Sequence, residues 1–98
     1  MLTIEKRGDD TVVIAGRLDA AQAASAQQFL DGMAGIVTLD CSDLEYISSA
    51  GLGVLLKTQK RLLKDGGKLR LVGASRHLCD IFKFSGLDMF FEIERARE

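Results

Sequence analysis

The sequence contains no proline and no tryptophan, and it has only two cysteines and one histidine. Because proline is absent, the turns and the helix ends have to be marked by glycine and by short polar residues. Cys41 and Cys79 lack the spacing of a metal site, so we expect two reduced, buried thiols. His77 is expected on the surface or at a helix start rather than in the role of a catalytic base.

A strong net charge and a long apolar run are also absent. The net charge of −1 argues against a nucleic-acid-binding module, which is normally basic. No apolar run approaches the ~18 residues that a membrane-spanning helix needs. The first residues, Met1–Lys6, lack the basic and apolar regions of a signal peptide. We therefore expect a cytoplasmic protein without direct nucleic-acid binding and without membrane insertion.

The length of 98 residues and the hydrophobic content of 47% suit one domain that spans residues 1–98 and has a modest core. Residues Leu2–Lys6 alternate between apolar and polar, and Thr11–Ala15 is rich in β-branched residues. The turn residues Gly8-Asp9-Asp10 lie between these two segments. The pattern predicts an N-terminal β-hairpin.

A first helix is predicted over Ala20–Leu30, with an end near Gly32. Asp19 is the expected N-cap, and Gln22 follows three residues later as in a capping box. The next segment, Ile36–Asp40, is a short apolar run and predicts a buried central strand.

The stretch from Leu39 to Gly53 is predicted to leave that strand, pass through an acidic turn and open into a helix over Ala50–Lys64. Gly66-Gly67 would end this helix. Its periodicity separates an apolar face from a basic face. The apolar face is expected to hold Leu52, Leu55, Leu56, Leu62 and Leu63, and the basic face Lys57, Lys60, Arg61 and Lys64.

The rest of the chain predicts a strand over Lys68–Val72 and a third helix capped by Ser75 and ended by Gly86. A last strand is predicted over Met89–Ile93, and the charged tail Glu94–Glu98 is expected to fray or to extend a final helix. The inward face of the third helix carries Leu78, Ile81 and Phe82.

Strands and helices alternate after the hairpin, which is typical of an α/β fold with a mainly parallel, mixed sheet. We expect four or five strands packed with three or four helices. Asp19 and Ser49 each follow a strand, so both are predicted at the carboxyl edge of the sheet, where open α/β sheets place their sites.

The sequence carries no enzyme motif. Ser49 has Ile47 two residues before it and so does not match a Gly-x-Ser-x-Gly nucleophile elbow. No phosphate-binding loop of the Gly-x-x-x-x-Gly-Lys type is present. A metal site formed by Asp40, Asp43 and Glu45 is less favoured than a solvated acidic loop, because their spacing fits no standard site. We expect no catalytic residue, no bound metal and no cofactor.

Ser48 and Ser49 stand at the start of the predicted second helix, where serine is a common N-cap. From the local sequence, a purely capping role for both is the favoured interpretation. One cap needs only one serine, however, so Ser49 is free to project if Ser48 caps. A phosphate there would meet free backbone N–H groups and the positive end of the helix dipole.

The stretch Tyr46–Gly53 resembles the signature of STAS domains, most closely that of bacterial anti-sigma factor antagonists. In that family an aromatic or apolar pair is followed by Asp, the phosphorylated Ser, a small residue and Gly-Leu-Gly or Gly-Leu-Arg. The corresponding residues are Tyr46-Ile47, Ser48 in place of Asp, Ser49, Ala50 and Gly51-Leu52-Gly53. Gly16-Arg17-Leu18-Asp19 and Phe84-Ser85-Gly86-Leu87 resemble two further family motifs, and the resemblance covers nearly the whole chain.

The resemblance implies a STAS fold and makes Ser49 the expected phosphorylation site. For Asp19 it adds a role in phosphorylation or kinase docking, which we weigh equally with a plain N-cap. It implies a partner-binding surface made of Asp19, Ser48, Ala50, Gly51, Leu52 and Gly53.

The resemblance also implies partner switching. The unphosphorylated form is expected to bind an anti-sigma factor that is also a GHKL-type serine kinase, and thereby to release the sigma factor. The kinase, which holds the ATP and magnesium, would phosphorylate Ser49 and end the binding, and a metal-dependent serine phosphatase would reset the switch. The alternatives are a STAS module in secretion or sensor regulation, a small-ligand-binding module, or a subunit of a transport complex.

Overall fold

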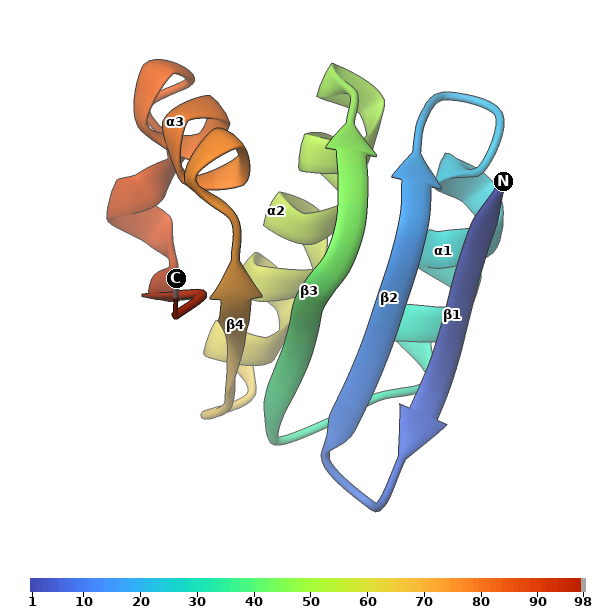
Figure 1. Ribbon diagram of the computed structural model, residues 1–98. Coiled ribbons are helices and arrows are strands. Elements are labelled where there is room, and N and C mark those ends of the chain that lie inside the picture. Colours follow the sequence, from blue (N-terminus) through green and yellow to red (C-terminus); the bar gives the residue numbers. More distant parts are fainter. Residues whose placement is uncertain (98) are drawn as a thin grey trace.

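A computed structural model describes residues 1–97 and shows a five-stranded sheet whose strands lie side by side in chain order (Figure 1). The first two strands form the expected antiparallel hairpin. The next three each add in parallel to the preceding strand, which confirms the prediction of a mainly parallel, mixed sheet. The strands are β1 (Leu2–Arg7), β2 (Thr11–Leu18), β3 (Ile36–Ile47), β4 (Lys68–Ala74) and β5 (Glu92–Arg95).

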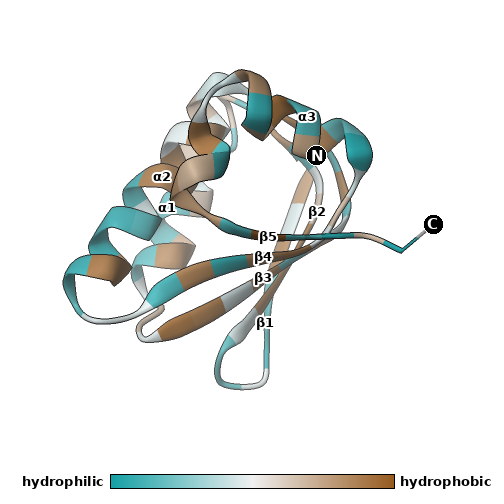
Figure 2. Ribbon diagram, turned by 90° about the vertical axis from the view of Figure 1, so that its left-hand side faces the viewer, coloured by the Kyte–Doolittle hydropathy of each residue, from teal (hydrophilic) through white to brown (hydrophobic). Residues whose placement is uncertain are grey.

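Two helices, α1 (Ala23–Asp31) and α2 (Ser49–Lys64), cover the same face of the sheet, and the edge-on view shows both on one side (Figure 2). On the other face of β1, β2 and β3, residues 1–97 place no helix (Figure 1). Helix α3 (Arg76–Phe84) and the 3₁₀ helix η1 (Leu87–Phe90) follow β4. Within residues 1–97, no helix combines the length and the apolar character that crossing a membrane requires.

The core lies between the sheet and the inner faces of α1 and α2. Leu52, Leu55 and Leu62 of α2 are buried, as the helical periodicity predicted. The assignment of Leu63 to that face was wrong, because this residue is 52% exposed. Successive residues of a helix differ by about 100° in direction, so with Leu62 facing the sheet, Leu63 points to the flank of α2. The largest fully buried side chains include Ile14, Leu18, Leu30, Leu39, Leu55, Leu62, Leu69, Leu71 and Phe82.

The acidic turn predicted after residue 40 is wrong, because β3 is twelve residues long and extends from Ile36 to Ile47. Leu44 and Ile47 in this second half are buried and pair with β2. The register of the β2–β3 pair shifts twice, which gives β3 extra residues relative to β2. Ser42 and Asp43 are exposed in succession at the first shift. Because two exposed residues in succession interrupt the alternation of a strand, the sequence pattern did not predict the second half of β3.

Helix α1 begins at Ala23 and not at Ala20, so the predicted helix start was wrong by three residues. Residues 20–22 form a turn instead. The backbone N–H of Gln22 donates to Asp19 Oδ1 (3.2 Å) and to the Asp19 carbonyl oxygen (3.1 Å). Asp19 therefore caps this turn, and Gln22 is the N-cap residue of α1 without a side-chain cap bond.

The C-terminal segment also differs from the prediction. Met89 belongs to η1, and the last strand begins at Glu92. Glu94 and Arg95 lie in β5 rather than in a frayed tail, and the N–H of Ala96 donates to the carbonyl oxygen of Ala74 (2.8 Å). Glu98, the last residue of the predicted tail, lies outside the described residues.

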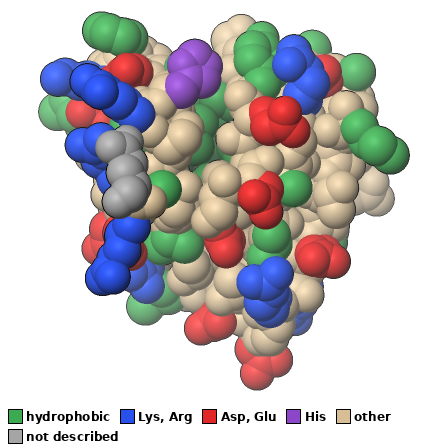
Figure 3. Space-filling model, in the orientation of Figure 1, with side chains coloured by type: hydrophobic (Ala, Val, Ile, Leu, Met, Phe, Trp, Pro, Cys, Tyr) green, Lys and Arg blue, Asp and Glu red, His purple; other side chains and the backbone are tan. Residues whose placement is uncertain are grey.

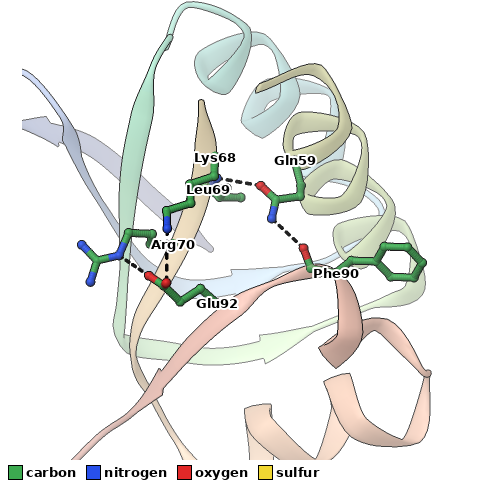
Figure 4. A network of polar contacts seen from close by, with 6 residues as sticks. All are labelled: Gln59, Lys68, Leu69, Arg70, Phe90 and Glu92. Carbon is green, nitrogen blue, oxygen red and sulfur yellow. Dashed lines mark hydrogen bonds and ion pairs between the residues drawn. The ribbon is translucent and has the colours of Figure 1, made fainter. Parts of the chain in front are cut away.

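Polar side chains of β4, β5 and α2 connect these three elements to one another (Figure 4). Lys68 and Arg70 of β4 form ion pairs with Glu92 of β5. Gln59 of α2 is buried, and its amide accepts from the Leu69 N–H (2.6 Å) and donates to the Phe90 carbonyl oxygen (2.6 Å). One side chain thus fixes α2 to β4 and to the end of η1.

Candidate functional site

The carboxyl ends of β2 and β3 meet at one edge of the sheet. Leu18 and Ile47, their last residues, are paired in register, and the N–H of Ser48 donates to the Leu18 carbonyl oxygen (2.9 Å). Asp19 follows Leu18 directly and Ser49 follows Ile47 after one residue, so both leave the sheet at the same edge, as predicted from the order of the elements. This is the edge at which open α/β sheets place their sites.

Ser48 is the N-cap of α2. Its Oγ accepts from the N–H of Gly51 (3.2 Å), and its carbonyl oxygen accepts from the N–H of Leu52 (2.9 Å). Its backbone is extended (φ −89°, ψ 173°), as an N-cap requires. Of the two serines, Ser48 therefore has the capping role, and the hydroxyl of Ser49 is not needed for it.

Ser49 is the first residue of α2, and its side chain is exposed. The N–H groups of Ser49 and Ala50 have no acceptor inside the helix, because the first turn of a helix lacks preceding carbonyls. No acidic side chain lies in the first turn of α2. A negative group on Ser49 would therefore meet free donors and the positive end of the helix dipole.

The two glycines of the first turn have different surroundings. A Cβ on Gly51 would lie 2.6 Å from the Leu18 carbonyl oxygen and 2.8 Å from Ile47 Cγ1. Gly51 thus lets α2 start close against the ends of β2 and β3. Gly53 is exposed, and a Cβ there would meet nothing within 4 Å.

The predicted partner-binding residues fall into two groups. Ala50 and Gly53 are exposed, and Asp19 and Ser48 are half-buried at the same edge. Gly51 and Leu52 are buried instead, and Leu52 is only 9% exposed. Gly51 and Leu52 therefore lie beneath the exposed residues of this edge and are not accessible to a partner.

A cationic side chain near the site was not singled out from the sequence. The guanidinium of Arg17 lies 4.2 Å from the centre of the Tyr46 ring, and the two residues are partners across β2 and β3. Such a contact is an attractive cation–π interaction. Arg17 belongs to the Gly16–Asp19 motif, and its place in this motif was the only sequence feature that could have pointed to it.

The acidic residues after Leu39 lie on β3 and not in a loop. Asp40 Oδ1 accepts hydrogen bonds from the N–H of Ser42 (3.0 Å) and from its hydroxyl (2.7 Å). These bonds hold the pKa of Asp40 below its ordinary value, because they favour the charged carboxylate. Among residues 1–97, no three His, Cys, Asp or Glu side chains are grouped so that they could hold a metal ion.

The remaining candidate side chains lie outside the site. Cys41 is a free, buried thiol, and burial raises its pKa to about 12. Cys79 is free as well but only partly buried, so the prediction of two buried thiols holds fully for Cys41 alone. His77 is exposed in the first turn of α3, as predicted.

Comparison with known proteins bears on the whole chain. A family model described as "Mlab, STAS domain" matches residues 2–93. BtrV of Bordetella bronchiseptica is 36% identical over 87 residues, which is 89% of this chain and 74% of BtrV. The anti-sigma-B factor antagonist of Bacillus subtilis is 31% identical over 97 residues, 96% of this chain and 89% of that protein.

Solved structures show the same fold. The unphosphorylated form of the anti-sigma factor antagonist SpoIIAA aligns with a TM-score of 0.72 and 20% identity over 99% of this chain and 90% of its own. The structure of Bacillus SpoIIAA in the phosphorylated form gives a TM-score of 0.69 and 23% identity over 95% of this chain and 90% of its own.

Proposed function

This chain belongs to the STAS domain family, and on that premise we propose that it is a non-catalytic switch protein controlled by phosphorylation of Ser49. The unphosphorylated form binds an anti-sigma factor that is also a GHKL-type serine kinase, and the sigma factor is released. Phosphorylation separates the complex, and a metal-dependent serine phosphatase restores the binding form.

The division of roles between the two serines is the observation that carries this proposal. Ser48 already caps α2, so the exposed hydroxyl of Ser49 is free to accept a phosphate without loss of the cap. The positive helix start accommodates the added charge of about −1.5 to −2. In the free protein, phosphorylation therefore costs little.

At a docked interface the same phosphate has a different effect. It would stand beside the exposed Ala50 and Gly53, where the partner has to approach the backbone closely. Burying an unpaired charge there costs roughly 3–5 kcal/mol. Because about 1.4 kcal/mol corresponds to a tenfold change in affinity, the loss of binding is at least about a hundredfold.

The relatives support this proposal in two ways. Curated relatives named anti-sigma-B factor antagonists share most of their length with this chain. SpoIIAA has been solved in unphosphorylated and phosphorylated forms, and both forms share the fold of this chain. A local effect of the phosphate, without refolding, is consistent with that likeness.

The test begins with the unphosphorylated protein as bait in a native lysate, followed by purification of the captured kinase. We expect ATP and magnesium to allow this kinase to phosphorylate wild type and Ser48→Ala on residue 49. Ser49→Ala should still bind the kinase but stay unmodified. Phosphate on Ser48 alone would contradict the assignment. The protein that the kinase releases on binding identifies the regulated pathway.

A further inference from the structure

The outer face of α2 carries a row of lysines that continues from Ser49. Gly53, Lys57, Lys60 and Lys64 follow Ser49 at intervals of three or four residues, so they lie on one side of the helix. All are exposed. We call Lys57, Lys60 and Lys64 the α2 lysine stripe. With a rise of about 1.5 Å per residue, the distance from Ser49 to the end of the stripe is about 22 Å.

Among residues 1–97, no ion pair neutralises the positive charge of the stripe. Helix α2 contains no Asp or Glu between Ser49 and Lys64. The ion pairs within residues 1–97 involve Arg61, Lys68 and Arg70 and none of the three lysines.

The nearest basic neighbour of the stripe faces inward. Nη2 of Arg61 donates to the carbonyl oxygens of Leu30 (2.9 Å) and Met33 (2.8 Å) at the end of α1. Asp31 lies beside Arg61, and Asp65 stands beyond the last lysine. Arg61 thus has a structural role, and in the described part of the chain the three lysine ammonium groups of this face form no ion pair.

An exposed apolar strip borders the stripe. Leu63, 52% exposed, lies one turn after Gln59, and Gln59 holds the Phe90 backbone against α2 (Figure 4). Phe90 is 50% exposed, and the adjacent Met89 is 86% exposed. The flank of α2 thus combines cations with accessible apolar side chains.

The opposite face of the molecule has a different character. Over the open face of the sheet, Asp and Glu side chains are spread across the centre and the right, whereas most visible Lys and Arg side chains lie along the left edge (Figure 3). We therefore expect a negatively charged segment to favour the lysine stripe of α2 over the open face of the sheet.

We propose that the α2 lysine stripe and its apolar border dock an acidic, partly apolar segment of the partner protein that contacts Ser49. This inference rests on the proposed function, because it extends the same interface along α2. Charge complementarity selects the occupant, and the continuous row from Ser49 to Lys64 places it next to the phosphorylation site. The segment increases the association rate and orients the partner over Ser49.

The first test compares two variants with the same change in net charge. Lys57→Gln/Lys60→Gln removes charge from the stripe, and Lys6→Gln/Lys83→Gln removes it from β1 and α3. We expect the stripe variant to associate with the purified kinase about tenfold more slowly at low salt, and the control to match wild type. The difference should vanish at high ionic strength. Equal rates for both variants would overturn the proposal.

A second test uses carbodiimide coupling, which joins a lysine amine to a carboxylate in direct contact with it. In the complex, Lys57, Lys60 or Lys64 should be linked to Asp or Glu of the kinase. Links only at Lys6 or Lys83 would overturn the proposal. Normal phosphorylation of Ser49 in that case would leave the proposed function intact.

A third test needs no kinase and so separates the failure of this inference from that of the proposed function. The ¹⁵N-labelled protein is titrated with a synthetic peptide of glutamates and leucines. Chemical-shift changes should concentrate at residues 57–64 and 89–90. Changes elsewhere, or binding at this face to anionic lipid vesicles or to a second copy instead of the peptide, would overturn the proposal.

Discussion

Asp19 is held at the site through one side-chain hydrogen bond, from the N–H of Gln22. Asp19→Ala removes this acceptor, and the loss of a cap costs ~1 kcal/mol, which a domain of this size usually survives. We expect the rate of Ser49 phosphorylation by the kinase to fall about tenfold or more. The reason is that Asp19 would contact the kinase, and a lost contact of about 1.4 kcal/mol corresponds to a tenfold effect. Melting curves and phosphate incorporation measure the two effects.

Asp19→Asn is the matched control, because it keeps the acceptor oxygen and removes the charge. If Asp19→Ala melts far lower than wild type yet is phosphorylated normally while folded, Asp19 is only a cap.

Asp40 makes a pH-dependent contribution to stability. Its folded pKa lies below the ordinary value of 3.8, because Ser42 donates two hydrogen bonds to the carboxylate. The stabilisation is therefore present above about pH 4 and is lost as the pH falls through the lowered folded pKa. Ser42→Ala should reduce the free energy of unfolding at pH 7 by about 1 kcal/mol or less, since Ser42 is exposed and Asp40 is only half-buried.

Urea unfolding at pH 7 and at about pH 2.5 tests this account, and the difference between Ser42→Ala and wild type should shrink at the lower pH. Ser85→Ala serves as the control, because the Ser85 hydroxyl donates to the Phe82 carbonyl oxygen, which does not titrate. A difference for Ser42→Ala that is unchanged at low pH would contradict the role of Asp40.

The local sequence favoured a capping role for both serines and left open that Ser48 alone caps, and the structure shows the cap bond on Ser48. Arg17 on Tyr46 and Arg61 on the end of α1 were not anticipated. Both contacts join residues that are distant in the chain. Their geometry depends on strand register and on helix–helix packing, which a local pattern does not contain.

At the scale of elements, the start of α2 offers a paired glycine experiment. Gly51→Ala places a Cβ against the backbone of Leu18, which cannot move aside, and should cost about 1–3 kcal/mol. Gly53→Ala meets no neighbour and should stabilise α2 by about 0.5–1 kcal/mol through higher helix propensity. Thermal unfolding measures both changes.

The same Gly53→Ala variant should bind the kinase more weakly than wild type, because the new methyl group lies on the surface beside Ser49. If this variant is more stable and yet binds less well, the loss of binding comes from the altered surface and not from a destabilised fold. Unchanged affinity would show that the partner does not approach this turn.

Gln59 joins three elements, so its removal should loosen the C-terminal part of the sheet. Gln59→Leu leaves the Leu69 N–H and the Phe90 carbonyl oxygen without their partner, at a cost of about 2 kcal/mol or more. Amide exchange at Leu69 should accelerate. Gln28→Leu, at an exposed position of α1, is the control and should change stability by less than about 0.5 kcal/mol. Equal stability of the two variants would contradict this role.

The elements with clean periodicity were predicted well, namely the hairpin, α2, β4 and α3. The errors occurred in strands whose side chains do not alternate regularly between buried and exposed. The irregular register of β3 interrupted the alternation of its side chains, and β5 has four residues with only Ile93 turned toward the core. A short edge strand of this kind is stabilised by pairing with its neighbour, through bonds such as Ala96 to Ala74, rather than by its own sequence.

For the whole molecule, we expect phosphorylation of Ser49 to leave the fold unchanged. The helix start accepts the phosphate locally, and the cap bond from Gly51 to Ser48 does not involve Ser49. Backbone chemical shifts of the two free forms should differ mainly at residues 48–56 and at Asp19. Changes spread over all five strands would instead indicate a global conformational switch.

The order of the strands has a consequence for synthesis on the ribosome. Every strand pairs with the strand before it in the chain, so none has to insert between two that are already paired. We expect the nascent sheet to grow at one edge as the polypeptide emerges, because each new pairing bridges only a short loop or a helical connection, the longest of which holds α3 and η1. The serine edge is built from β2, β3 and α2, so we expect it to assemble without β5, the last strand to emerge.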